Sequence, residues 1–188
     1  KVIVRDLDRS REIELPEDTL SNDVDTVLKN SDIEIIVEVM GGLDPAGQYI
    51  RRALVAGKHV VTANKELIAK EGPDLFEIAR KHGSSLHFEA SVAGAIPAIH
   101  PQLRDLRANK IRSITGIING TTNYILTNMV QKGMTFDSAL SEAQSLGYAE
   151  SDPTSDVEGY DAAYKIAILA SLAFDQRVSP DDVITEGI

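Results

Sequence analysis

The sequence predicts an α/β protein, in which an open sheet of parallel strands is followed by a second region of α+β type. Short apolar runs alternate with amphipathic helical patterns through the first half of the chain, as in strands joined by crossover helices. The run from Ile33 to Met40 has few polar interruptions, which is typical of a strand covered on both faces. After about residue 93 this alternation ends. We therefore expect one domain at residues 1–93 and another at residues 94–188.

The first region is expected to contain four strands and three helices. The strands are predicted at residues 2–5, 34–40, 59–63 and 85–90, and the helices at residues 24–30, 45–56 and 73–82. Pro45 suits the first position of the second helix, after Asp44 as its N-cap, and Gly57 suits its end. These boundaries fit a doubly wound sheet, whose ligands bind beyond the carboxyl ends of the strands.

The second region is expected to be mainly helical, with one strand. Helices are predicted at residues 98–107, 122–131, 135–145 and 159–174, a strand at residues 110–119, and an acidic loop at residues 152–156.

Composition excludes several classes of protein. Of 188 residues, 43% are hydrophobic and 26% are charged, which is ordinary for a globular chain. The formal net charge of -10 argues against a nucleic-acid or anionic-membrane partner. The chain has no cysteine, so disulfides, a thiolate nucleophile and cysteine-bound metal are excluded. It shows neither a signal peptide nor a membrane-spanning apolar run, which favours a cytoplasmic location.

The stretch from Ala143 to Lys165 holds five carboxylates and one lysine around a loop that leads into an apolar helix. Asp161 and Lys165 are four residues apart, so they lie on one face of that helix. A solvated acidic turn would explain Asp152 and Asp156, but not a lysine within an apolar helix. Several carboxylates beside one lysine suit a substrate with an ammonium group, which the carboxylates bind while the lysine acts on a nearby oxygen.

Strand ends supply further candidates. Gly41 and Gly42 permit close approach of the backbone to a ligand, or simply form a tight turn. Lys65 follows a possible N-cap, Asn64, and would oppose the helix dipole there, which is a functional hint unless it is an ordinary surface lysine. Glu89 precedes a turn whose carbonyls could bind a monovalent cation; alternatively, it accepts hydrogen bonds from backbone amides, which the pattern alone favours.

Residues 119–123 form a polar cluster, Asn-Gly-Thr-Thr-Asn, between a predicted strand and a predicted helix. Helix capping explains part of this cluster but not all of it. The chain has no G-x-G-x-x-G turn, nucleophile elbow or P-loop, and its four histidines lack metal-ligand spacing.

Taken together, these motifs resemble one family, homoserine dehydrogenase. The stretch from Ala143 through Gly147, Asp152, Asp156 and Asp161 to Lys165 is similar to the family signature in residue types and spacing. Further similarities, in the family's order, are found at residues 38–42, 62–65, 89–94 and 119–125.

The resemblance implies a nicotinamide-dependent oxidoreductase of threonine and methionine biosynthesis that interconverts L-aspartate 4-semialdehyde and L-homoserine. It implies a truncated Rossmann-like nucleotide-binding sheet followed by a substrate-binding and dimerisation domain. It also implies NADP or NAD as cofactor and a homodimer as the assembly. Because residues 1–5 already read as a strand, the chain is expected to be a fragment. Compared with the family pattern, it is expected to lack the first strand with the N-terminal Gly-rich turn and, since it stops at residues 183–188, the C-terminal return segment.

The resemblance also implies a role for individual residues. Lys165 would exchange the proton at the substrate oxygen, and Lys65 would lie beside nicotinamide and substrate. The other implied groups are Glu150, Asp161 and Asp156 at the amino acid portion of the substrate; Gly41, Gly42, Gly147 and Lys65 at the cofactor; and Glu89 with the carbonyls of Val92, Gly94 and Ile96 at a sodium or potassium ion.

Several alternatives stay open. The chain could be a catalytically inactive piece that serves as a folding or dimerisation module, with residues 110–119 pairing across a dimer. A related amino-acid dehydrogenase with another substrate is a further alternative, whereas aspartate semialdehyde dehydrogenase is excluded because its reaction needs a cysteine. Asp6 favours NAD and its arginine neighbours favour NADP. Burial would lower the pKa of Lys165 and Asp161 would raise it.

Overall fold

The computed structural model describes residues 1–188, which form two compact units. The first unit consists of Lys1–Thr62 and Pro73–His87, and the second of Ala63–Gly72 and Phe88–Ile188. Helix α3 (Lys65–His82) contributes residues to both units. The domain boundary expected near residue 93 stays a prediction.

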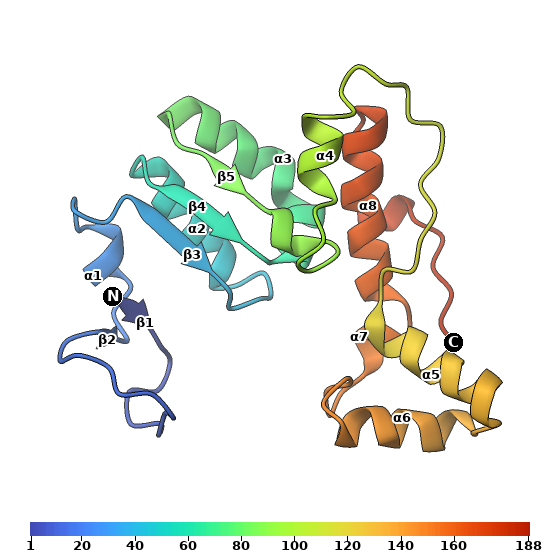
Figure 1. Cartoon of the computed structure of the whole chain (residues 1–188). Helices are drawn as coiled ribbons and strands as arrows, with labels where there is room; N and C mark the ends of the chain where they lie inside the picture. Colours follow the sequence, from blue (N-terminus) through green and yellow to red (C-terminus); the bar gives the residue numbers. More distant parts are fainter. The chain divides into compact units, whose positions relative to one another are not determined.

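A three-stranded parallel sheet forms the centre of the first unit (Figure 1). Its order is β3 (Ile35–Glu38), β4 (His59–Thr62) and β5 (Leu86–His87). Helix α2 (Ala46–Val55) connects β3 to β4 and packs against both. This βαβ arrangement confirms the predicted α/β class and brings Glu38 opposite Thr62 at the carboxyl ends of the strands.

The sheet is covered on one face only. Ile50 and Leu54 of α2 are fully buried. On the opposite face of β3, by contrast, Ile35 and Val37 are 58% and 64% exposed. The expectation of a strand covered on both faces is therefore wrong for this chain, because α2 packs on one side of the sheet and these side chains point to the other.

The N-terminal part of the first unit is a small separate sheet. Strand β1 (Val2–Ile3) pairs in parallel with β2 (Leu20–Ser21), and the short helix α1 (Asp25–Leu28) follows. An ion pair between Arg52 and Asp25 joins α1 to α2. The buried side chain of Lys58 donates to the carbonyls of Asn30 and Ile33 at 2.6 and 2.5 Å, so it satisfies acceptors in the loop between α1 and β3.

Two predicted helix starts differ from the structure. Helix α3 begins at Lys65 and continues through Pro73, whereas the sequence pattern placed a helix at residues 73–82. The backbone N–H of Leu67 donates to the side chain of Asn64 at 3.1 Å, which confirms Asn64 as a capping residue. Asp44, in contrast, does not cap α2, which begins at Ala46 without a side-chain cap.

The second unit is helical. It contains α4 (Ile99–Leu103), α5 (Gly120–Lys132), α6 (Phe136–Ser145), α7 (Thr154–Val157) and α8 (Tyr160–Phe174), with short 3-10 helices η1 (Glu89–Ser91) and η2 (Pro180–Asp182). Helices α5 and α6 pack together, and α8 packs against α4 and α7 (Figure 1). Buried side chains of α5, α6 and the loop after α6 form a small apolar core: Ile125, Ala139, Ala143 and Ala149.

Residues 110–119 form no strand, so that prediction is wrong for this structure. They belong to the long irregular connection between α4 and α5 (Figure 1). Residues 110–117 exchange no backbone hydrogen bond with another segment, and Ile117 is 79% exposed. Alternating apolar residues favour extended backbone, but a strand exists only when a neighbouring strand pairs with it.

None of the helices combines the length and apolarity needed to cross a membrane.

Candidate active site

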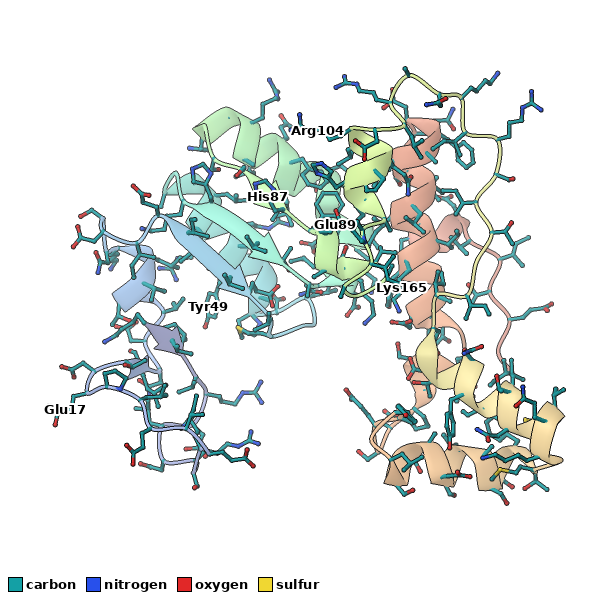
Figure 2. The ribbon with its side chains drawn as sticks, in the orientation of Figure 1. Glu17, Tyr49, His87, Glu89, Arg104 and Lys165 are labelled. Atoms are coloured by element: carbon teal, nitrogen blue, oxygen red, sulfur yellow. The ribbon has the colours of Figure 1, made fainter.

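The first turns of α8 hold an acid and a base in contact. The Nζ atom of Lys165 lies 2.6 Å from Oδ2 of Asp161 and donates to the carbonyl oxygen of Ile118 at 2.7 Å. This pairing confirms the prediction that the four-residue spacing places both side chains on one helix face. Figure 2 labels Lys165 on α8 within the second unit.

A second lysine reaches the same carboxylate from another helix. The Nζ atom of Lys65, at the start of α3, lies 3.0 Å from Oδ1 of Asp161. The side chain of Lys65 is 38% exposed and that of Lys165 only 16%, so Lys165 is the more enclosed ammonium. Each oxygen of Asp161 therefore faces a different cation.

Asp161 is held in its charged form. It is only 4% exposed, and this burial by itself raises the pKa of its carboxyl. Hydrogen bonds from Lys165, Asn119 and Lys65 outweigh burial and bring the pKa below its ordinary value. The site thus has a permanent anion between two ammonium groups at neutral pH.

Asn119 joins this group from the N-terminus of α5. Its Nδ2 atom donates to Oδ2 of Asp161 at 2.8 Å and to Oδ1 of Asp156 at 2.7 Å. Its Oδ1 atom accepts from the backbone N–H and the hydroxyl of Thr122, at 2.8 and 2.9 Å. Sequence reasoning noted the polar cluster around Asn119 without a role for this residue. The sequence signal that could have identified Asn119 was a cluster with more polar groups than a helix cap requires.

A hollow of about 480 Å³ opens beside these residues in the second unit. Its charged lining residues are Asp156, Asp161 and Lys165, and the others are Asn119, Gly120, Thr121, Asn123, Tyr124, Thr127 and Tyr148. The rings of Tyr124 and Tyr148 lie 4.9 Å apart between centroids, and the hydroxyl of Thr121 donates to the carbonyl of Tyr148 at 2.7 Å. A hollow of this volume, with charged groups and tyrosine rings on its lining, suits a molecule of amino-acid size.

Two predicted site residues of the same unit lie outside this group. Glu150 is exposed and does not line the hollow; its carbonyl oxygen accepts from the amide of Gln144 at 3.1 Å. Gly147 follows α6 with a φ of 77° and donates its N–H to the carbonyl of Gln144. The structure brings Lys65, Lys165, Asp156 and Asp161 together; the roles of Glu150 and Gly147 stay predictions.

The glycine turn predicted to approach a cofactor lies in the first unit, after β3. Gly41 and Gly42 have φ values of 77° and 72°, and a Cβ on either would meet open space. Glu38, which is 4% exposed, accepts from the N–H groups of Met40 and Gly41 at 2.7 and 3.0 Å. Its other oxygen accepts from the hydroxyl of Thr62 at 2.6 Å. Glu38 therefore fixes this turn, a role that sequence reasoning missed; the signal was a carboxylate closing an apolar strand.

Glu89, labelled in Figure 2, caps α4 from outside the helix. Its carboxylate accepts from the backbone N–H groups of Ala98, Ile99 and His100 at 2.7 to 2.9 Å. Burial raises the pKa of Glu89, but these three bonds lower it more, so it lies below the ordinary value. This arrangement matches the alternative in which Glu89 accepts from backbone amides.

The turn after Glu89 also offers oxygen ligands. The carbonyl oxygens of Val92, Gly94 and Ile96 accept no hydrogen bond within the chain. Carbonyl and carboxylate oxygens are the hard ligands that a sodium or potassium ion accepts, so these residue types suit the predicted cation, which stays a prediction. The three N–H donors on Glu89 leave about one of its four acceptor positions for such an ion.

Comparisons with known proteins place both halves of the chain beside one family. Residues 1–89 match the model described as "Homoserine dehydrogenase, NAD binding domain", and residues 97–188 match the model described as "Homoserine dehydrogenase". A homoserine dehydrogenase of Synechocystis sp. is 52% identical over 98% of this chain and 43% of its own length. One from Bacillus subtilis is 47% identical over 100% of this chain and 43% of its own length. The chain thus spans less than half of these curated relatives.

Solved structures show similarity to the same family. A homoserine dehydrogenase from Thiobacillus denitrificans has a TM-score of 0.87 and 48% identity, covering 90% of this chain and 39% of that one. A hyperthermophilic archaeal homoserine dehydrogenase in complex with NADPH has a TM-score of 0.75 and 32% identity, covering 86% of this chain and 52% of that one. The fold of both units is therefore similar to known structures of this family.

Proposed function

This chain belongs to the homoserine dehydrogenase family, oxidoreductases with an NAD-binding domain, and from this we propose that it interconverts L-aspartate 4-semialdehyde and L-homoserine. The observation that supports the proposal best is the contact of Lys65 and Lys165 with opposite oxygens of Asp161, beside a hollow of amino-acid size. We further propose that the L-homoserine formed is used in threonine and methionine biosynthesis.

A nicotinamide cofactor, NAD or NADP, would supply the hydride. Gly41 and Gly42 fit this group because their open turn lets a ligand approach the backbone closely. We propose that these glycines, Lys65 and Gly147 contact the cofactor. The archaeal relative was solved with NADPH, which supports this class of cofactor without deciding between the two.

Lys165 is the proposed proton donor and acceptor. Its ammonium is fixed by Asp161 and by the carbonyl of Ile118, and it lines the hollow. When an aldehyde is reduced, negative charge develops on its oxygen. An ammonium at that oxygen stabilises the charge and then gives up its proton. Oxidation of the alcohol requires the same lysine to be neutral and to accept the proton.

The acidic residues have different proposed tasks. Both oxygens of Asp161 are engaged by lysines or by Asn119, so Asp161 chiefly holds the two ammonium groups in place. Asp156 lines the hollow and uses one oxygen towards Asn119, which leaves its other oxygen for the ammonium of the substrate. Glu150 is proposed to assist Asp156. A sodium or potassium ion at Glu89, Val92, Gly94 and Ile96 would hold the turn before α4.

The first test is homoserine-dependent reduction of NAD or NADP, followed by absorbance. The chain is assayed alone, and also in place of the corresponding residues of the Bacillus subtilis relative, since it covers 43% of that protein. Lys165→Met should lose at least about a thousandfold in activity if the lysine transfers the proton. Lys132→Met is the matched control, because Lys132 is an exposed lysine paired with Glu142. A folded chimera that does not oxidise homoserine would defeat the proposal.

A second candidate function is an assembly module. It is favoured by the irregular segment at residues 110–117, whose backbone makes no hydrogen bond to another segment and which could pair with the same segment of another copy. Light scattering separates the two proposals when it is combined with the assay. A dimer without activity in either context supports the module, whereas activity that depends on Lys165 supports the enzyme.

A further inference from the structure

The side-chain amide of Asn119 meets two acidic residues of the site at one nitrogen atom. We infer that Asn119 is a positioning residue, which orients Asp156 and Asp161 relative to Lys165. This inference rests on the proposed function for its effect on the substrate, but the geometry behind it can be tested without any assay of activity.

The hydrogen bonds of Asn119 allow only one orientation of its amide. An amide has two N–H donors and two acceptor positions, and here both donors and both acceptors are used. A rotated amide would turn its oxygen towards two carboxylates and its nitrogen towards the N–H of Thr122. Because Asn119 is only 8% exposed, water could not readily supply the hydrogen bonds that a rotated amide would lose.

The same short segment also holds the proposed proton donor. Lys165 donates to the carbonyl oxygen of Ile118, the residue before Asn119. Residues 118 and 119 therefore fix the ammonium through a backbone oxygen and the carboxylates through a side-chain amide. This one segment therefore sets the distance between Lys165 and Asp156. Lys165 would act on the reacting oxygen, and Asp156 would bind the ammonium of the substrate.

Helix capping alone does not explain this choice of residue. The cap of α5 uses only the oxygen of Asn119. Serine caps a helix as well as asparagine does, but it has no amide to donate to two carboxylates. Asn119→Ser therefore keeps the cap and removes the bridge. Thr135→Ser, at the cap of α6, is the matched control, because it exchanges one capping residue for another away from the site.

The decisive experiment is a titration of the aspartate carboxyl groups, followed by NMR on this chain. Asp161 faces three groups, Lys65 of α3, Lys165 of α8 and Asn119, whereas Asp156 faces Asn119. In Asn119→Ser, with the lysines in place, the titration midpoint of Asp161 should rise, because a donor to its charged form is lost. In Thr135→Ser it should not move. An unchanged Asp161 midpoint in a folded Asn119→Ser would overturn the inference and leave Asn119 as a cap.

The unaltered chain supplies a second measurement that does not depend on folding of a variant. If the amide bridges both carboxylates, both of its side-chain hydrogens should exchange slowly with solvent, and their chemical shifts should follow the titration of Asp161. Rapid exchange and shifts that ignore the titration would contradict the bridge. In active protein, Asn119→Ser should raise KM for homoserine about tenfold with a smaller change in kcat. Absence of homoserine oxidation in the unaltered protein would count against the proposed function alone.

Discussion

Lys165 lies one helical turn after Asp161 in α8, with its ammonium nitrogen 2.6 Å from the carboxylate. Because the side chains are only 16% and 6% exposed, this contact is largely shielded from solvent. The pair is therefore part of the stability of the second unit as well as of its proposed chemistry.

Asp161→Asn should destabilise the protein by about 2 to 3 kcal/mol, since it leaves two lysine ammonium groups without the anion between them. The exposure of Lys65 places the expected value below the range for fully buried pairs. Denaturant unfolding measures this change. Glu66→Gln is the control, because it removes a carboxylate from the more exposed pair with Lys70, and should cost less than about 1 kcal/mol. Equal losses in the two variants would show that burial of Asp161 does not matter.

Stability should fall in acid partly through Asp161 and Glu89. Their folded-state pKa values lie below the ordinary 3.8 and 4.5, so the charged forms stabilise the fold above those values. This contribution is lost as the pH falls through the lowered pKa values. The melting temperature should therefore decline below about pH 4.5, and the decline should be shallower in Asp161→Asn and Glu89→Gln. If the melting temperature of one variant falls with pH as steeply as that of the unaltered protein, the substituted residue does not contribute to the acid dependence.

If the turn at Gly41 contacts the cofactor as proposed, Glu38→Ala should weaken binding of NADPH about tenfold, because the turn loses the acceptor that fixes two of its N–H groups. Fluorescence titration with NADPH measures this loss. Glu38→Gln retains one oxygen for the same N–H groups and should bind NADPH more nearly as the parent does. If alanine and glutamine variants bind equally well, the turn does not need Glu38.

Gly159→Ala should cost more stability than Gly133→Ala. Both glycines have positive φ, 82° and 66°, so alanine introduces backbone strain of about 1 kcal/mol at either position. A Cβ at Gly159 would also lie 2.9 Å from the carbonyl oxygen of Glu186, whereas one at Gly133 meets open space. The difference between the two unfolding free energies reports this contact. Similar values would mean that residues 185–187 move away without cost.

Features that depend on local spacing could be predicted from the sequence. The four-residue interval between Asp161 and Lys165 fixes them on one helix face in any α-helix. The apolar runs around β3 and β4 identify strands, and the helix between them requires a parallel pairing. The cap at Asn64 follows from residue type and position alone.

Features that depend on distant partners could not be predicted in this way. The alternation at residues 110–119 suits a strand, but it does not say whether another strand lies beside it. The contact of Lys65 with Asp161 joins helices α3 and α8, and no pattern within either helix indicates it. Only the family resemblance placed these two residues in one site. Likewise, the role of Asn119 depends on Asp156 and Asp161, which come close only through tertiary packing.

The bonds of Asn119 also bear on how the second unit folds. They join the start of α5 to residues 37 and 42 positions further along the chain, so they form only after the intervening segment has closed into a loop. The amide that begins α5 is thus satisfied completely only when α7 and α8 have arrived. The cap of α5 uses only the oxygen of Asn119 and can form from local sequence, whereas the acidic cluster is complete only in a chain whose second unit has closed.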